Sequence, residues 1–200
     1  MSAAFGRDAL LDAFDQIGHA AVLAGTKLQI AVYGGSALML ASNFRFATED
    51  VDVSALEQPL PDWLAKVVHE IAEKNEWQDD WFNDGVAFHL SSLADQAADH
   101  LEFGTFPRAG APGLVVLVPS AEYLLALKLK AIRVTDPLRG ETERLDILNL
   151  MQVVGISTVE DAIALLGKYF PVSAASSEKQ RFLLKNMNRE GSIDAPKYPR

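Results

Sequence analysis

The feature that most constrains the fold is a short apolar segment that ends at two glycines. Residues 28–33 read Leu-Gln-Ile-Ala-Val-Tyr, and such a run, bounded by turn residues, predicts a buried strand. Gly34 and Gly35 then predict a turn, and residues 36–41 are rich in helix formers. The sequence therefore predicts a strand, a glycine turn and a helix in direct succession, a unit typical of proteins that mix helices with a sheet.

A second predicted strand, over residues 50–53, carries two aspartates. It reads Asp-Val-Asp-Val, and because side chains alternate along a strand, Asp50 and Asp52 are expected on one face, with the valines in the core. Two carboxylates on one face repel each other, and aspartate is a poor strand former, so the pair calls for a cation. Oxygen ligands of this kind suit Mg²⁺ or Mn²⁺.

The glycine turn offers a complementary binding feature. Gly34 and Gly35 have no side chain to keep phosphate oxygens from the backbone. The Ser36 hydroxyl and the amides at the start of the helix can donate hydrogen bonds to such oxygens. Either motif alone is common in plain turns or on solvated strands, but the two motifs in this order predict a polyphosphate chelated by a metal ion.

Strand signals dominate the first 120 residues and helix signals the last 80. We therefore expect an α+β (α/β) fold with a core over residues 1–119, a helical C-terminal region packed on it over residues 120–188, and a flexible tail over residues 189–200. Helices are expected at residues 7–24, 36–41, 61–71, 120–133, 141–154, 158–169 and 177–187. Ser120 is expected to cap one of these helices, and Ser157 with Glu160 another.

Composition excludes several classes of protein. The 200 residues include 27 acidic and 18 basic side chains and no cysteine, and the formal net charge is −9. The lack of cysteine rules out disulfides, thiolate zinc sites and cysteine nucleophiles, and fits a cytoplasmic location. No run approaches the roughly 20 apolar residues of a membrane span, and the first eight residues do not predict a secretory signal. An acidic chain also disfavours binding to duplex DNA or to a membrane surface.

The ordered motifs resemble a known superfamily. Residues 33–38, Tyr-Gly-Gly-Ser-Ala-Leu, followed by Arg45-x-x-Thr48-x-Asp50-Val-Asp52, are similar to the signature of the DNA-polymerase-β-like nucleotidyltransferases. The second motif resembles the bacterial branch that contains the abortive-infection nucleotidyltransferase toxins of type IV toxin–antitoxin systems. Further similar segments are residues 80–84, residues 120–131 and Glu143-x-x-Asp146-Ile147. The resemblance covers about residues 31–150.

The resemblance implies a nucleotidyltransferase-like mixed β-sheet flanked by helices. It implies transfer of a nucleotidyl group from Mg-NTP to a hydroxyl of an unknown acceptor, in the role of a toxin that has an antitoxin protein as partner. The metal ligands would be Asp50 and Asp52, joined by Glu102 as the third catalytic carboxylate. The nucleotide-binding residues would be Gly34, Gly35, Ser36, Arg45, Thr48 and Lys128.

Two departures from the family pattern bear on these roles. Relatives carry a basic–acidic pair ahead of the second acidic residue, whereas Thr142 and Glu143 precede Asp146 here. Glu102 has the apolar neighbours expected of a third carboxylate, but it lies in residues 77–113, a segment without a clear period.

The helical half offers further ionisable candidates. Lys128 falls on an apolar helix face, so its amine either reaches solvent along its stem or contacts a phosphate. Glu143 and Asp146 share a helix face and are expected to form surface ion pairs with Arg144 or the helix of Lys128. The four histidines lack zinc-ligand spacing, and we expect them at the surface or partly buried with their bonding groups satisfied. Trp77 and Trp81 are expected to anchor the core.

Two further functions remain open on the sequence. A protein with this fold that has lost turnover would bind nucleotides or protein partners without transferring a group, and the obscure third carboxylate would fit that reading. A metal-dependent glycosyltransferase also uses an Asp-x-Asp pair, but it would leave the glycine turn without a role. The acceptor of a nucleotidyltransferase is equally open among a protein, a tRNA end, a small hydroxyl compound and a free nucleotide.

Overall fold

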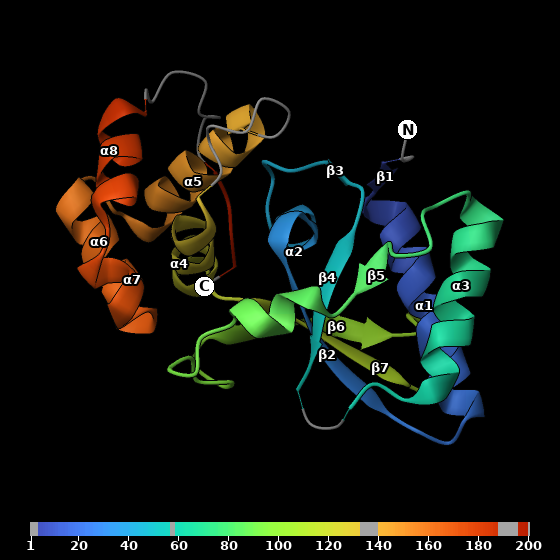
Figure 1. Cartoon of the computed structure of the whole chain (residues 1–200). Coiled ribbons are helices and arrows are strands. Elements are labelled where there is room, and N and C mark those ends of the chain that lie inside the picture. Colours follow the sequence, from blue (N-terminus) through green and yellow to red (C-terminus); the bar gives the residue numbers. More distant parts are fainter. Residues whose placement is uncertain (1–3, 57–58, 133–139, 188–195, 200) are drawn as a thin grey trace.

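The computed structural model describes residues 4–56, 59–132, 140–187 and 196–199. The described residues form a five-stranded mixed sheet in the order β5-β4-β2-β7-β6 and a small two-stranded sheet of β1 and β3 (Figure 1). The strands are β1 (Phe5–Gly6), β2 (Leu28–Tyr33), β3 (Ala47–Thr48), β4 (Val51–Ala55), β5 (Phe82–Asn83), β6 (His100–Phe106) and β7 (Leu114–Pro119). Central strand β2 pairs antiparallel with β4 and parallel with β7. The outer strand β5 runs parallel to β4, and β6 antiparallel to β7.

Helices cover the sheet and then follow it. They are α1 (Arg7–Leu23), α2 (Gly34–Ala41), α3 (Asp62–Asn75), the 3₁₀ helix η1 (Gly85–His89), α4 (Ala121–Ala131), α5 (Gly140–Val154), α6 (Val159–Tyr169), α7 (Pro171–Ala175) and α8 (Glu178–Asn186). Figure 1 shows α1 and α3 together at one side of the sheet, and α4–α8 gathered at the other. We call α4–α8 the helical part. The α+β fold class expected from the sequence is confirmed.

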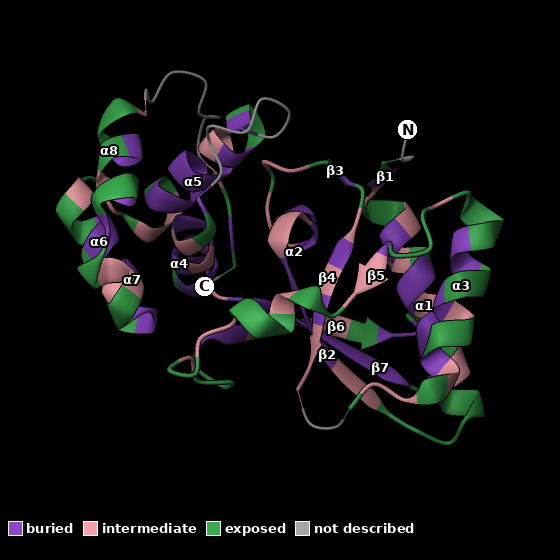
Figure 2. Ribbon diagram, in the orientation of Figure 1, coloured by how far each residue is buried: buried purple, intermediate pink, exposed green. Residues whose placement is uncertain are grey.

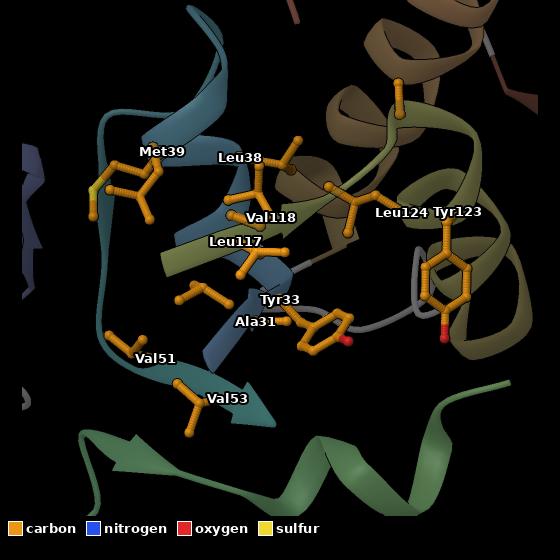
Figure 3. Close-up of a cluster of buried hydrophobic side chains, with 14 of the residues drawn as sticks. Ala31, Tyr33, Leu38, Met39, Val51, Val53, Leu117, Val118, Tyr123 and Leu124 are labelled. Atoms are coloured by element: carbon orange, nitrogen blue, oxygen red, sulfur yellow. The ribbon is translucent and has the colours of Figure 1, made fainter. Parts of the chain in front are cut away.

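The core follows from the apolar runs of the central strands. All six residues of β7 and the last four of β2 are buried, and Figure 2 shows burial concentrated in these strands and on the inner faces of the helices. Figure 3 shows one cluster of this core, to which β2, β4, β7, α2 and α4 contribute: Ala31, Tyr33, Leu38, Met39, Val51, Val53, Leu117, Val118, Tyr123 and Leu124. The sheet and the first helix of the helical part therefore share one apolar core.

Trp77 and Trp81 pack in the core as expected, beside the N-terminal strand β1. Trp81 is fully buried, and its indole N–H donates to the carbonyl oxygen of Val68 over 3.0 Å. The ring of Trp77 stacks on Phe5 with 4.1 Å between centroids. These contacts hold β1 and the segment before β5 against α3.

The helix starts agree with the sequence at one cap and correct it at another. The Ser120 hydroxyl accepts a hydrogen bond from the Tyr123 amide, as expected of the cap of α4. At α6 the cap is Thr158, which accepts from the Asp161 amide over 3.1 Å, so the cap expected at Ser157 was wrong by one residue. The reason is that Thr-x-x-Asp overlaps Ser-x-x-Glu in the chain and has the same spacing. The short helix α7, with a proline at its start, was not predicted.

The expected flexible tail, residues 189–200, lies largely outside the described residues. In its described part, Tyr198 is buried, and its hydroxyl donates to the carbonyl oxygen of Pro119 over 2.7 Å. The Lys197 amide donates to Asn43 Oδ1 over the same distance. Tyr198 thus holds this segment at the end of β7, and Lys197 holds it at the loop after α2. These contacts do not fit the expectation of a frayed end.

Within the described chain, no single helix is long and apolar enough to cross a membrane. The pair α5 and α6 meets the length and composition only jointly, with a bend of 89° at the break between them.

Candidate active site

Two adjoining cavities open among the described residues between the sheet and the helical part. Their volumes are about 610 Å³ and about 530 Å³. Both are lined by Gly34, Asp52, Lys128 and Glu143, so they meet where β2 ends. We call them together the cleft.

The two cavities differ in their walls. The larger, called the apolar cavity, is also lined by Tyr33, Val86, Leu124, Leu127 and Ala131. The smaller, called the polar cavity, is also lined by Arg45, Thr48, Glu49, Asp50 and Thr142. The cleft therefore offers one compartment suited to an apolar or planar group and another suited to a polar group.

The two aspartates singled out by the sequence lie in this cleft. Asp52 is on β4, where it is the register partner of Tyr33 on β2, and it lines both cavities. Asp50 lies one residue before β4 rather than within the strand, and it lines the polar cavity. Strand β4 therefore places Asp52 at the junction of the cavities, and Asp50, just before the strand, in the polar cavity.

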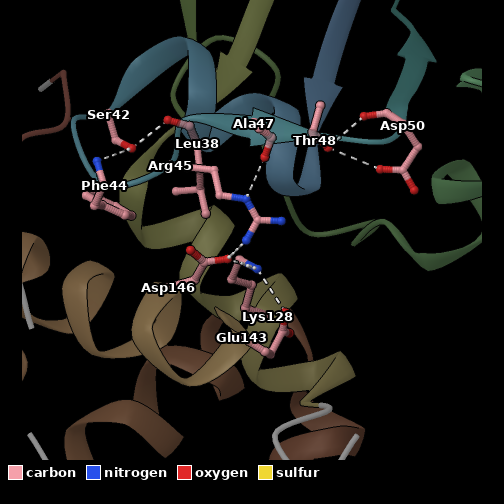
Figure 4. Close-up of polar contacts among 10 residues, drawn as sticks. All are labelled: Leu38, Ser42, Phe44, Arg45, Ala47, Thr48, Asp50, Lys128, Glu143 and Asp146. Atoms are coloured by element: carbon pink, nitrogen blue, oxygen red, sulfur yellow. Dashed lines mark hydrogen bonds and ion pairs between the residues drawn. The ribbon is translucent and has the colours of Figure 1, made fainter. Parts of the chain in front are cut away.

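The backbone at Asp50 is held by two hydroxyls. Thr48 Oγ1 donates to the Asp50 carbonyl oxygen over 3.0 Å and lies 3.4 Å from its carboxylate (Figure 4). Ser36 Oγ donates to the same carbonyl over 2.5 Å. Ser36 is buried beneath the turn, so this structure gives its hydroxyl a supporting role in place of the phosphate contact that we expected.

Gly34 lies directly against Asp52, and Gly35 lies against Arg45. Gly34 has φ +64°, and a Cβ atom on it would lie 2.8 Å from Asp52 Oδ2. A Cβ atom on Gly35 would lie 2.9 Å from Arg45 Nη2 and 3.3 Å from Thr48 Oγ1. Both glycines therefore permit a close approach of side chains to the start of α2, which is a requirement the sequence alone did not reveal.

Lys128 is part of a buried cluster of ion pairs. Its Nζ lies 3.1 Å from Glu143 Oε2 and 3.0 Å from Asp146 Oδ2, and Asp146 Oδ2 also pairs with Arg45 Nη1 over 3.2 Å (Figure 4). Lys128 is 8% exposed and Asp146 is 2% exposed. Two cations and two carboxylates neutralise one another here, which offsets the cost of burying each charge.

The cluster corrects two expectations. The surface ion pairs predicted for Glu143 and Asp146 were wrong in their exposure, because the apolar face of α4 packs on α5 and turns these carboxylates inward. The Lys128 amine is held by carboxylates, so the structure does not bear out a lysine reaching along its stem into solvent. An ammonium group has three donors, so an amine bonded to these two carboxylates retains one for a phosphate oxygen in the cleft.

Acidic groups outnumber basic groups along the cleft walls. The acidic lining residues are Glu49, Asp50, Asp52 and Glu143, and the basic ones are Arg45, Lys128 and Lys130. Asp146 behind Arg45 and Lys128 adds a further carboxylate, so the formal charge of these groups together is negative. Such a charge attracts cations and repels anions that arrive without a counterion.

Glu102 is not brought to the aspartates. It is an exposed residue of β6, at the sheet edge opposite β5, and β2 and β7 separate β6 from β4. Three strand spacings correspond to about 14 Å. The apolar neighbours of Glu102 made it a candidate for the third carboxylate, but they carry no information on strand order.

The strand neighbour of Asp52 on the other side is Asn83. The two are register partners between β4 and β5, and both line the apolar cavity. Sequence reasoning missed Asn83 as a site residue, and the available signal was its presence in residues 80–84, a segment included in the family resemblance. An amide in this position can donate and accept hydrogen bonds.

The donor set can be tested against the metal that the resemblance implies. Among the described residues, no group of three or more histidine, aspartate or glutamate side chains is arranged as a metal centre. Asp50 and Asp52 provide two carboxylates at one cavity, and Mg²⁺ is commonly held by one or two carboxylates with substrate phosphates and water. The residues therefore fit a metal ion that arrives with a phosphate ligand.

Comparisons of the chain with protein-family models, with curated proteins and with solved structures gave no match.

Proposed function

We propose that the chain is a metal-dependent nucleotidyltransferase, which transfers a nucleotidyl group from Mg-NTP to a hydroxyl group of an acceptor. The observation that carries the proposal is the position of Asp52 against Gly34 at the junction of the two cavities. It joins a carboxylate pair suited to Mg²⁺ or Mn²⁺ with a turn suited to phosphate oxygens, as a chelated polyphosphate requires.

The residues of the cleft have distinct roles in this proposal. Asp50 and Asp52 would hold the metal ion, which supplies charge neutralisation and alignment of the reacting oxygens when bound. The backbone at Gly34 and Gly35 would receive phosphate oxygens. Arg45 and Lys128 would supply positive charge, since each has N–H donors beyond the one that it directs at Asp146.

The reaction itself makes one bond and breaks one bond. The acceptor oxygen bonds to the α-phosphorus, the bond from that phosphorus to the bridging oxygen breaks, and pyrophosphate leaves. The hydroxyl proton passes to a carboxylate, for which Asp50 and Asp52 are the candidates in the cleft, since Glu102 lies on a distant strand.

The division of the cleft suggests where each substrate binds. The apolar cavity, with a volume of about 610 Å³, is in the size range of small-molecule sites and has Leu124, Leu127 and Val86 as walls for a nucleoside. The polar cavity on the other side of Asp52 would receive the acceptor hydroxyl. The acceptor stays open among the four classes named from the sequence. Through the family resemblance, the proposal also includes the role of a cytoplasmic toxin that has an antitoxin protein as its partner.

One observation favours a second candidate, a nucleotide-binding or protein-interaction module without turnover. The described neighbours of Asp52 across the sheet are Tyr33 and Asn83, so neither strand offers a third carboxylate beside it. Such a module would bind Mg-NTP but transfer nothing.

Titration calorimetry with the four NTPs, with and without Mg²⁺, tests the proposal together with a radiolabel-transfer assay that uses α-labelled NTP. Asp52→Asn should abolish Mg²⁺-dependent binding while the fold survives, because loss of a repelling charge does not destabilise the metal-free site. Asp79→Asn is the matched control, since its exposed carboxylate is lost from a loop away from the cleft. Unchanged Mg-NTP affinity in Asp52→Asn contradicts the metal role, and binding without transfer supports the module.

A further inference from the structure

A buried series of aromatic and polar side chains connects the end of β2 to the helical part. The Tyr33 hydroxyl lies 2.8 Å from His100 Nε2, and the imidazole ring meets Tyr123 of α4 edge-on at 5.7 Å. The Tyr123 ring lies 4.9 Å from that of Tyr169 on α6, whose hydroxyl donates to Asp99 over 2.6 Å. None of these groups was assigned a role in binding or transfer.

The partners of His100 define its protonation. His100 Nδ1 lies 3.2 Å from the carbonyl oxygen of Gln96, and a carbonyl oxygen only accepts, so Nδ1 carries the proton. Nε2 is then the acceptor, and the Tyr33 hydroxyl is the donor. Among the described residues, the Tyr33 hydroxyl has no other hydrogen-bond acceptor. The pair is therefore complete only with a neutral imidazole.

Tyr33 is placed to transmit this bond to the candidate site. It is the last residue of β2 and directly precedes Gly34, whose φ of +64° starts the turn. Its backbone pairs with Asp52 across the sheet, and the residue is among those that line the apolar cavity. Its ring is almost fully buried between the sheet and α4, close to Tyr123 (Figure 3). A change in the packing of this ring is therefore transmitted to the backbone of Tyr33, which adjoins Gly34 and pairs with Asp52.

We propose that His100 is a positioning residue for the cleft, which fixes the Gly34–Gly35 turn by accepting the hydrogen bond of Tyr33. His100 touches neither cavity, so it acts through Tyr33 alone. The occupancy of the cleft by Mg-NTP rests on the proposed function, whereas the positioning of the turn does not.

The surroundings of His100 keep the imidazole neutral. The ionisable groups around it are Tyr33 from β2, Tyr123 from α4, and Asp95 and Asp99 from the segment before β6. Its strand neighbour on β7 is Pro119, which carries no charge. Burial lowers the pKa of His100, and the two carboxylates and the Gln96 carbonyl offset this in part. The Asp99 carboxylate is already bonded to Tyr169 and to the Asp95 amide.

Three variants separate positioning from simple packing. Tyr33→Phe removes the donor and keeps the ring, His100→Leu removes the acceptor, and His100→Gln restores an acceptor that does not titrate. Tyr169→Phe is the matched control, because it deletes a tyrosine hydroxyl at the far end of the same series. Should His100→Leu fail to fold, Tyr33→Phe and His100→Gln still decide the question.

Amide hydrogen exchange of residues 34–38 is the primary measurement, and it needs no nucleotide. Tyr33→Phe and His100→Leu should speed exchange there by about fivefold to tenfold, the factor expected for loss of one buried hydrogen bond. His100→Gln should restore the wild-type rate, and Tyr169→Phe should leave it unchanged. Unchanged exchange in both Tyr33→Phe and His100→Leu overturns the proposal, as does equal acceleration in Tyr169→Phe.

The affinity for Mg-ATP between pH 5.5 and 8, measured by calorimetry, is the second measurement. Wild type should lose affinity on acidification more steeply than His100→Gln, and the difference between the two profiles removes the titration of the nucleotide itself. If wild type binds no nucleotide at any pH, the proposed function fails while the exchange measurement still decides the role of His100.

Discussion

Asp52 Oδ2 lies 2.8 Å from the position that a Cβ atom would take on Gly34. The carboxylate therefore fills the space that any larger residue in the turn would need. This contact follows from the register of β2 and β4, in which Tyr33 and Asp52 are opposite each other and Gly34 extends just past the pair. The positive φ of Gly34 thus favours glycine, and a Cβ atom there would in addition displace the Asp52 carboxylate.

We expect Gly34→Ala to lower both the stability and the Mg-NTP affinity. The positive φ alone costs about 1–2 kcal/mol for an alanine, and displacement of Asp52 adds to this cost. Chemical denaturation measures the first effect, and calorimetry with Mg-NTP measures the second.

Gly25→Ala is the control for this prediction. Gly25 has φ +65° but nothing within 4 Å of its Cβ position, so it bears the backbone cost without a clash. Equal losses of stability in the two variants, with nucleotide affinity unchanged in Gly34→Ala, would contradict a special role for the Gly34–Asp52 contact.

Asp146→Asn should destabilise the protein by about 3 kcal/mol, the lower end of the range for removing one member of a buried ion pair. The carboxylate serves both Lys128 and Arg45, and Lys128 retains Glu143 in the variant, which limits the loss. Glu141→Gln on the same helix is the control, because solvent screens its exposed pair with Arg144 and its loss should change the stability little. Urea unfolding of the two variants gives the comparison, and similar small losses would mean that the buried cluster does not stabilise the fold.

The local pattern of apolar and polar residues was enough to predict the strands that carry the candidate site. The apolar run before Gly34 and the alternation at Asp52 predicted β2, α2 and β4, because periodicity is a local property. Helix α2 begins at Gly34, directly after β2, so the two residues expected to form a turn are its first two residues. The position of Glu102 depended on strand order, which is set by packing between segments far apart in the chain. For the same reason β5 and β6 were not found in residues 77–113.

The pairing within the ionic cluster could not be predicted from the sequence, for a different reason. The helical spacing of Glu143 and Asp146 indicated a shared face, and the apolar face of α4 indicated that Lys128 was unusual. Whether these faces meet is decided by the crossing of α4 and α5, and Arg45 joins from a loop on the other side of the cleft. A charge on an apolar face predicts that a partner exists, but it does not identify that partner.

Stability should fall as the pH is lowered below the ordinary histidine pKa of 6.5. Burial lowers the pKa of His100 in the folded protein, so the unfolded chain binds more protons in the window just below 6.5, and acid favours unfolding. The contribution is complete above that pH and is lost as the pH falls through the folded pKa. His100→Gln should show a shallower loss of stability over this window in denaturation curves measured from pH 7.5 to pH 5, and parallel profiles would assign the loss to other groups.

We expect no sub-micromolar binding to duplex DNA at about 150 mM salt, where nonspecific dissociation constants are typically 10⁻⁴ to 10⁻⁶ M even for DNA-binding proteins. Basic residues cluster in the sequence at Lys128, Lys130, Arg133 and Arg139, with Arg144 just beyond, and the net charge of the chain is −9. Arg133 and Arg139 lie outside the described residues. Lys128 is buried against two carboxylates, the Lys130 amine donates to the His89 carbonyl, and Arg144 pairs with Glu141. These side chains are already engaged and the protein is acidic, so fluorescence anisotropy with random duplex should detect little binding. A sub-micromolar constant at that salt would show that Arg133 and Arg139 outweigh the rest of the surface.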